Sequence, residues 1–161
     1  MNNIELIEKY PFLKIENNDL AVENLEGMST KLDWMPVGWR KSFGEKMCQE
    51  ISEALINDGV PLEEYYILDI KEKFGALRWY DANSGEAYNE VNNIIDKYEA
   101  ISERTCICCG EPATKISLGW ISPYCDSCAS GINNDGIRLK NTVPIEEFYN
   151  DSHTINASEN I

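Results

Sequence analysis

The chain has 161 residues and a formal net charge of −14, from 28 acidic and 14 basic side chains, and its hydrophobic content of 43% suffices for a buried core. This charge makes nucleic acid a poor partner, because nucleic-acid binding draws its affinity from cationic contacts to phosphates, and the chain has no basic stripe. No apolar run reaches membrane-spanning length, so we expect no membrane segment. The acidity would suit a basic protein surface, or it serves only to keep the chain soluble.

The first 35 residues are rich in turn formers and contain one short strand candidate, residues 12–15. From Pro36 the pattern changes to that of an amphipathic helix, which Pro36 suits as a first helical position. Apolar side chains then recur every four residues, at Trp39, Phe43, Met47, Ile51 and Leu55. The run from Asn57 to Gly59, followed by Pro61, predicts the end of this helix.

A β-hairpin and a second helix are predicted next. Residues 65–73 and 76–80 are rich in β-formers and flank a Phe-Gly pair, so they predict two antiparallel strands joined by a tight turn. Residues 85–103 have apolar side chains at helical spacing, which predicts a second amphipathic helix.

Two Cys-x-x-Cys pairs follow: Cys106 with Cys109, and Cys125 with Cys128. Fifteen residues separate the pairs, a spacing that is typical of a four-cysteine zinc site. The residues between them alternate, with apolar side chains at 116, 118 and 120, as expected for two strands that turn near Gly119. Four thiolates around one Zn²⁺ leave no open position for water, so the pattern predicts a structural metal in a zinc ribbon.

Disulfide bonds are the alternative for these cysteines, and they require an oxidising compartment. The N-terminus has no apolar core of signal-peptide length, so we expect the chain in a reducing cytosol, where zinc is favoured. Cys108 lies inside the first pair and is either a spare thiol or an alternative ligand. Cys48 lies on the apolar face of the first helix and is expected to be a small buried side chain.

Beyond the cysteines, residues 143–149 are expected to pack back on the body, and the polar residues 150–161 are predicted to be a disordered tail. The sequence therefore predicts a single α+β domain over residues 1–149. Its antiparallel hairpin is packed by two amphipathic helices, and a four-cysteine zinc ribbon at residues 104–131 is appended after the second helix.

The segment Ile70-Lys71-Glu72-Lys73-Phe74-Gly75-Ala76-Leu77-Arg78-Trp79-Tyr80, read with Gly38-Trp39 and the four cysteines, resembles small uncharacterised zinc-binding proteins carried by bacteriophages, prophages and other mobile elements. The resemblance covers residues 36–130 and supplies no known activity. It implies a context, because small phage accessory proteins commonly bind and redirect a host component. Inhibition of bacterial antiphage defence is one such role.

Cations and aromatic side chains on the first helix and the hairpin form a candidate binding face. Its members are Arg40, Lys41, Lys71, Lys73, Arg78 and Tyr80. Arginine beside aromatic rings is common at protein interfaces and in pockets that stack a nucleobase and hold a phosphate. The alternative is that the aromatics are core and the cations are a solvated strand face. Strand alternation predicts that Arg78 points away from the face of Leu77 and Trp79.

The sequence lacks the motifs of the common enzyme classes. The one histidine, His153, lies in the polar tail, which leaves no Ser-His or Cys-His arrangement in the body. The chain has no His-x-Glu of a zinc deaminase and no glycine-rich phosphate loop, although a carboxylate-bound magnesium nuclease stays open. The sequence favours non-enzymatic binding to a host protein. A pocket that sequesters a small nucleotide signal is the alternative, and a zinc-ribbon contact to nucleic acid is a third.

Overall fold

The computed structural model describes residues 2–16, 30–131 and 141–158, with side chains as far as residue 151 in the last range. The helices and strands follow one another as α1 (Asn3–Lys9), α2 (Val37–Trp39), α3 (Glu45–Asn57), β1 (Ile67–Lys73), β2 (Ala76–Asp81), α4 (Asn89–Ser102), β3 (Lys115–Ser117), β4 (Pro123–Tyr124), α5 (Asp126–Ser130), β5 (Thr142–Pro144) and α6 (Ile145–Ser158). The fold is thus a mixture of helices and small antiparallel sheets, as predicted.

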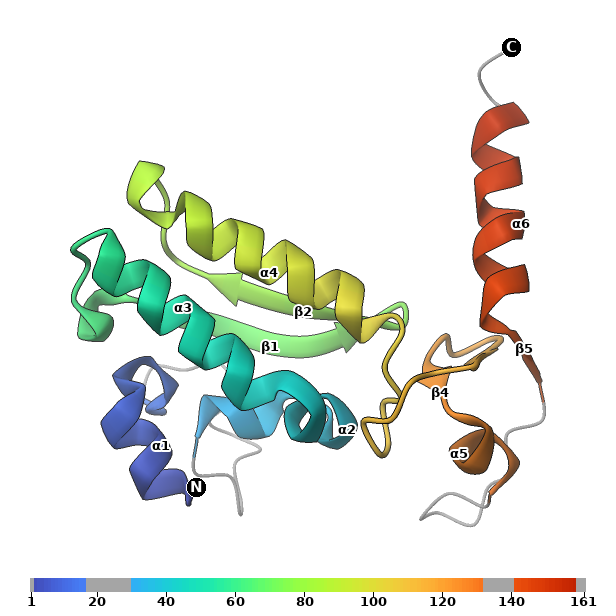
Figure 1. Ribbon diagram of the computed structural model, residues 1–161, viewed down its shortest axis with the longest axis horizontal. Helices are drawn as coiled ribbons and strands as arrows, with labels where there is room; N and C mark the ends of the chain where they lie inside the picture. Colours follow the sequence, from blue (N-terminus) through green and yellow to red (C-terminus); the bar gives the residue numbers. More distant parts are fainter. Residues whose placement is uncertain (1, 17–29, 132–140, 159–161) are drawn as a thin grey trace.

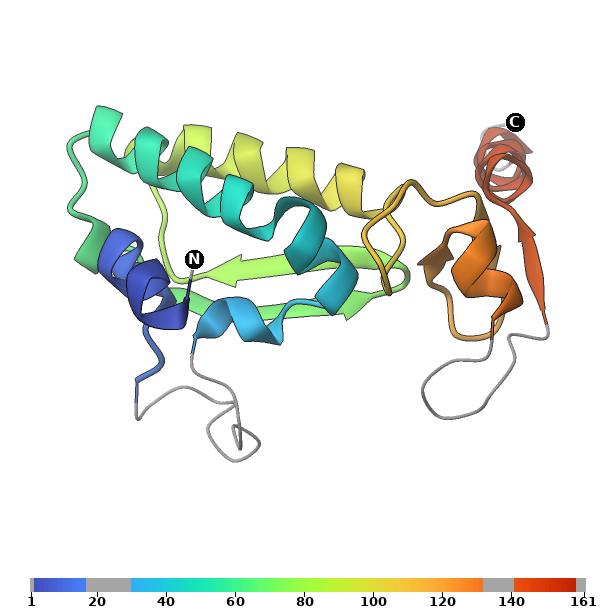
Figure 2. The same cartoon turned by 60° about the horizontal axis from the view of Figure 1, so that its bottom comes forward.

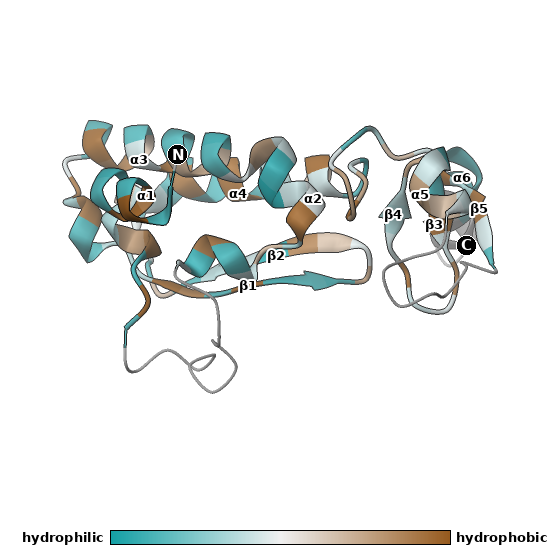
Figure 3. Ribbon diagram, turned by 90° about the horizontal axis from the view of Figure 1, so that it is seen from below, coloured by the Kyte–Doolittle hydropathy of each residue, from teal (hydrophilic) through white to brown (hydrophobic). Residues whose placement is uncertain are grey.

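Two long helices, α3 and α4, lie along the β1–β2 hairpin, and the cysteine-containing segment lies beyond the turn of that hairpin (Figures 1 and 2). Both helices are amphipathic, with hydrophobic and hydrophilic residues in separate bands (Figure 3). The apolar side chains of α3, α4 and the inner face of the hairpin form one buried cluster. None of the helices within the described ranges is both long and apolar enough to cross a bilayer.

The first predicted helix is present, but its winding is not uniform. Residues Arg40–Gly44 form a π-helical segment that joins α2 to α3 without a break. All five apolar residues of the four-residue repeat, from Trp39 to Leu55, are buried. In a regular α-helix each four-residue step overshoots a full turn by about 40°, so a strict repeat of four would drift around the helix. The slower winding of the π-helical segment offsets this drift and keeps Trp39 and Phe43 on the core side.

The hairpin also matches the prediction. Strands β1 and β2 are antiparallel, with Ile70 opposite Trp79 and Lys73 opposite Ala76. A two-residue loop joins them, in which Phe74 has φ 53° and Gly75 has φ 80°. Positive φ at both positions is the requirement of a type I′ turn, whose twist fits the flanking strands.

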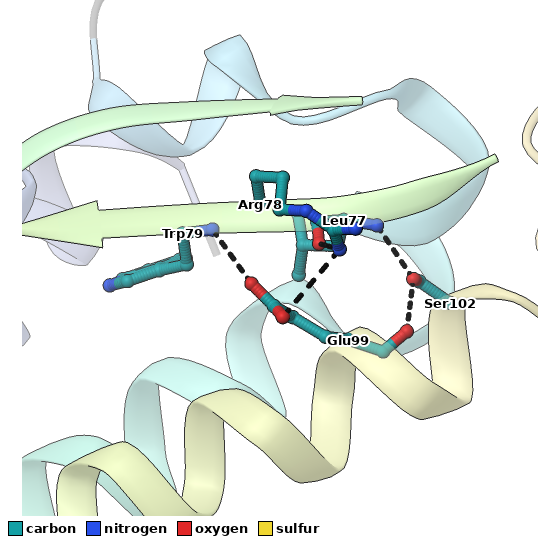
Figure 4. A network of polar contacts seen from close by, with 5 residues as sticks. All are labelled: Leu77, Arg78, Trp79, Glu99 and Ser102. Atoms are coloured by element: carbon teal, nitrogen blue, oxygen red, sulfur yellow. Dashed lines mark hydrogen bonds and ion pairs between the residues drawn. The ribbon is translucent and has the colours of Figure 1, made fainter. Parts of the chain in front are cut away.

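Side chains of α4 cover the free edge of β2 (Figure 4). The backbone N–H of Leu77 donates to Ser102 Oγ at 2.8 Å, and that of Trp79 donates to Glu99 Oε1 at 3.4 Å. Burial raises the pKa of the Glu99 carboxyl despite the hydrogen bond from Trp79 and the nearby charge of Arg78. Two of the N–H groups that this edge strand would offer to another chain are therefore paired within the fold.

Two N-terminal features differ from the predictions. Pro11–Leu13 form a 3₁₀ turn, so the strand predicted at residues 12–15 is wrong. Phe12 and Leu13 are consecutive and both buried, an arrangement that a tight turn permits and strand alternation does not. Before it, α1 begins at a capping box in which the Asn2 side chain accepts from Glu5 N–H and Glu5 accepts from Asn2 N–H.

The C-terminal region adds a strand and a helix. Strand β5 pairs with β3, which gives the order β4-β3-β5, and the Ile145 N–H donates to Thr114 O at 3.0 Å. Ile145 is buried, so the expected packing of residues 143–149 is present and is directed at the cysteine segment. The helix α6 runs to Ser158, whereas the sequence predicted a disordered tail from residue 150 onward. Residues 159–161 lie outside the described ranges.

Truncation of Leu77 tests this packing. Leu77→Ala should lower the free energy of unfolding by about 2–5 kcal/mol, because the leucine is fully buried and its removal opens a cavity. The matched control is Leu68→Ala on β1, where the side chain is 43% exposed and the expected change is below about 0.5 kcal/mol. Urea denaturation followed by circular dichroism measures both values. Equal losses in the two variants would contradict the burial of the β2 face.

Candidate metal centre

One sulfur atom from each of Cys106, Cys109, Cys125 and Cys128 lies within 4.8 Å of the other three. The Cys109 and Cys125 sulfurs are 3.6 Å apart. A tetrahedral zinc site with Zn–S bonds of about 2.3 Å has neighbouring sulfurs about 3.8 Å apart, so the cluster fits one metal ion. These are the four cysteines that the sequence predicts as ligands.

Backbone hydrogen bonds shape the first cysteine pair. The Gly110 N–H donates to Cys106 O at 3.0 Å, and the Cys106 N–H donates to Glu111 O at 2.8 Å. These bonds close a tight knuckle that turns both sulfurs of the pair toward the same point. The chain leaves the knuckle through Gly110, which has φ 83°.

The second pair is built on the start of a short helix. Cys125 is the N-cap of α5, and its sulfur accepts from the Cys128 N–H at 3.4 Å. The two pairs are joined through β4, because the Ile107 N–H donates to Pro123 O at 3.0 Å. Strand β4 also pairs with β3, with Lys115 opposite Tyr124. The predicted strand pair is therefore present between the cysteine pairs.

The first knuckle is attached directly to α2. The Gly38 N–H donates to Ile107 O at 2.9 Å, and the indole N–H of Trp39 donates to Thr105 O at 2.9 Å. A Cβ atom on Gly38 would lie 2.3 Å from Cys106 O, far inside van der Waals contact. The backbones approach so closely that only glycine fits at position 38.

The electrostatics of the cluster favour a bound cation. Burial by itself would raise the pKa of Cys106, but hydrogen bonds at the backbone of Cys125, Cys109 and Cys108 outweigh it and lower that pKa to about 7. At Cys128, burial and hydrogen bonds with the neighbouring cysteine sulfurs raise the pKa. The site thus accommodates one thiolate readily and further thiolates only with a compensating positive charge, which a divalent metal supplies.

The remaining cysteine predictions have clear outcomes. All six cysteines are free, so the disulfide alternative has no support. Cys108 is exposed and is not among the four clustered sulfurs, which favours the spare-thiol alternative. Cys48 is fully buried in the core, as predicted, and burial raises the pKa of its thiol.

The predicted binding face is divided between two places. Arg40 forms an ion pair with Asp33 and donates to Asn3 Oδ1 at 3.0 Å, so its charge is directed toward the N-terminal segments. Lys41 is exposed on the π-helical segment. The other members lie on the hairpin, where Lys71 is opposite Arg78.

On the hairpin, two of the predicted cations are already paired. Lys71 lies 3.1 Å from Asp69 and 5.3 Å from the centre of the Tyr80 ring. Arg78 starts on the face opposite Leu77, but its guanidinium bends back to Leu77 O at 2.8 Å and to Glu99 at 3.6 Å (Figure 4). Arg78 is therefore half-buried and contributes to the packing of β2 on α4.

Lys73 differs from these cations. Its ammonium lies 5.6 Å from the centre of the Phe74 ring, and no carboxylate of the described residues lies within ion-pair distance. Lys73 lies beside a groove that the sequence did not predict. The groove has a volume of about 200 Å³ and lies where the hairpin turn meets the β3–β4 loop. Its lining residues are Glu72, Lys73, Phe74, Gly119, Trp120 and Ile121.

Two large aromatic side chains of this groove are exposed to solvent, Phe74 at 74% and Trp120 at 78%. The alternation predicted through residues 116, 118 and 120 holds only for buried Ile116, because β3 ends at Ser117 and the chain then turns outward. A sequence signal for the groove did exist. Type I′ turns favour Asn, Asp or Gly, so an aromatic residue at the first turn position is unusual.

A comparison with protein-family models, with curated proteins and with solved structures finds no significant match to this chain. The resemblance to phage-borne proteins therefore stays a prediction.

Replacement of one clustered cysteine tests the metal centre. Cys109→Ser should lose the bound metal, because a hydroxyl does not replace a thiolate ligand at neutral pH. The matched control is Cys108→Ser, which removes the adjacent exposed thiol and should keep one metal ion per chain. Elemental analysis of purified protein gives the metal and its stoichiometry. Full occupancy in Cys109→Ser, or loss in Cys108→Ser, would contradict the ligand set.

A second prediction concerns the attachment of the first knuckle. Gly38→Ala should destabilise the protein by about 1–3 kcal/mol, because the added methyl group overlaps the Cys106 carbonyl and forces the backbones apart. The neighbouring Val37→Ala is the control, since Val37 is 70% exposed. Thermal unfolding measures stability, and a chromogenic chelator measures the rate of metal loss, which should rise in Gly38→Ala alone. Unchanged stability and metal retention would contradict the close contact.

Proposed function

We propose that this chain is a non-enzymatic binding protein that a structural Zn²⁺ stabilises and that docks on a protein of the bacterial host. The observation that carries the proposal is the pair of exposed aromatic rings, Phe74 and Trp120, that both line an apolar groove. Exposed apolar surface of this kind is costly to keep in water and is typical of interaction sites. Aromatic side chains also supply much of the binding energy at protein interfaces.

Zinc is the metal that suits the centre best. Four thiolates at tetrahedral spacing are the ligand set of structural zinc sites. With all four positions filled by protein, the ion has no place for a substrate or an activated water. Its contribution is then to the folding of residues 104–131 and to the position of the Trp120 loop.

The host context comes from the resemblance to proteins of phages and mobile elements. In that context a small acidic protein would bind a host component, and a component of antiphage defence is the partner that we propose. The net charge of −14 supports a protein partner over nucleic acid, because phosphates would be repelled. Sequestration of a nucleotide signal has less support, since Lys73 is the one cation among the described residues that line the groove.

Affinity capture from a bacterial lysate tests the proposed function. The tagged full chain should retain a host protein, and Trp120→Ala should reduce its recovery, because truncation of an anchoring aromatic typically costs about 2 kcal/mol or more. The control Ile4→Ala removes a comparably exposed side chain from α1 and should not change recovery. Mass spectrometry of retained proteins and small molecules separates the outcomes. Retention of a nucleotide without a protein would contradict the proposal.

Nucleic-acid binding gives an independent test. At micromolar protein and low salt we expect no mobility shift of short DNA or RNA, because the acidic surface offers no array of cations for phosphates. A shift that fades steeply as the salt concentration rises would contradict the proposed protein partner.

A further inference from the structure

The groove beside Lys73 is built by two turns that touch each other. Gly75, in the hairpin turn, approaches Ile121 so closely that a Cβ atom on Gly75 would lie 3.0 Å from Ile121 Cγ2. Two hydrogen bonds between Ser117 and Ser122 close the β3–β4 loop that carries Ile121. The Ser117 N–H donates to Ser122 O, and the Ser122 N–H donates to Ser117 Oγ, each at 3.0 Å. The walls of the groove therefore belong to two mutually supported turns.

Phe74 is held at this groove against its local preference. Its φ of 53° lies in the left-handed region, which bulky side chains seldom adopt. The turn requires this conformation, which glycine or asparagine adopts with less strain, and the mostly exposed Phe74 ring gains little from burial within the chain. Strained residues are concentrated at binding sites, so an aromatic side chain at this turn position favours a contact with a partner. A partner that covers the ring would supply the missing burial.

The charge inside the groove is positive at one point. The Glu72 carboxylate accepts the Gly75 N–H at 2.6 Å and is thereby engaged in the turn. Lys73 has no such partner among the residues that the structure describes, apart from the Phe74 ring. Among the described lining residues, the groove thus combines apolar walls with one ammonium group that forms no ion pair, beside a Glu72 carboxylate that is hydrogen-bonded within the turn. The Lys73 ammonium suits an apolar group that carries one negative charge.

From these observations we infer that the groove binds a peptide segment of the partner protein in which a large apolar side chain adjoins a carboxylate. The apolar side chain would lie between Phe74 and Trp120, and the carboxylate would pair with the Lys73 ammonium. A nucleoside polyphosphate fits less well, because its several negative charges would face one cation among the lining residues that the structure describes. The inference rests on the proposed protein-binding function and adds the chemistry of the bound segment.

Synthetic peptides test the inference on the purified, metal-loaded chain. The probe is acetyl-Gly-Glu-Leu-Phe-Glu-Gly-amide, with versions in which both Glu residues are replaced by Gln or by Lys. Heteronuclear NMR at increasing peptide concentration should show shifts at the amides of Phe74 and Gly75 and at the indole N–H of Trp120. The Glu peptide should bind about two- to fivefold more tightly than the Gln peptide, the range expected of an exposed ion pair, and the Lys peptide should bind more weakly still.

Three variants of the chain measure how much each side chain of the groove contributes to peptide binding. Trp120→Ala should weaken the Glu peptide about 30-fold or more, as expected for an aromatic anchor. Phe74→Gly leaves a Gly-Gly loop that suits the turn, so it should keep the fold and still weaken binding. Lys73→Gln should abolish the preference for Glu over Gln, whereas the control Lys41→Gln, which removes an exposed charge from the π-helical segment, should retain it.

Equal binding of the Glu, Gln and Lys peptides would overturn the charge preference, and the absence of shifts at Phe74 and Trp120 would overturn the groove as the site. If either result were obtained and Phe74→Gly still captured the host protein from lysate, the partner would bind at another surface of the chain, and the protein-binding function would stand. Capture of no protein would instead contradict the proposed function itself.

Discussion

The close approach of the Gly38 backbone to the first cysteine knuckle is the contact on which the arrangement of the two parts of the structure depends. At this point the helix that begins at α2 and the loop that carries Cys106 share a hydrogen bond from the Gly38 N–H to Ile107 O, with no side chain between them. The Trp39 indole adds a second bond, to Thr105 O. Because Trp39 is also fully buried in the main core, the knuckle is attached directly to that core.

This attachment links the metal centre to the groove. Two of the clustered cysteines lie in the attached knuckle, and the other two lie just after the β3–β4 loop that carries Trp120. A metal ion that binds all four would therefore connect the loop to the helical body through short covalent and coordinate paths. Structural metals supply folding free energy to such segments, so the position of Trp120 relative to Phe74 would depend on an ion that touches neither residue.

Periodicity and spacing predicted the elements that are amphipathic or defined by a few residue types. The buried repeat from Trp39 to Leu55, the hairpin around its Phe-Gly turn and the clustered cysteines all have such local signals. The features that escaped prediction depend on long side chains. The Arg78 side chain starts on the face opposite Leu77, as strand alternation predicts, yet its guanidinium bends back to form an ion pair with Glu99 on α4. Lys31 is almost fully buried and donates to Ile67 O, a contact across 36 residues that no local pattern encodes.

The π-helical segment Arg40–Gly44 has a further consequence for the metal centre. Each residue of an α-helix turns the chain by about 100°. If one residue were lost from this segment and regular winding were restored, the seven steps left between Trp39 and Met47 would turn the chain by about 700°, close to two full turns. Gly38 and Trp39 would then keep their side of the helix, and the contact with the knuckle would not be turned away. A deletion within the regular winding of α3 would instead rotate Gly38 by about 100° relative to the residues beyond the deletion. Single-residue deletions should therefore be tolerated far better in the π-helical segment than in α3, although neither alters a clustered cysteine.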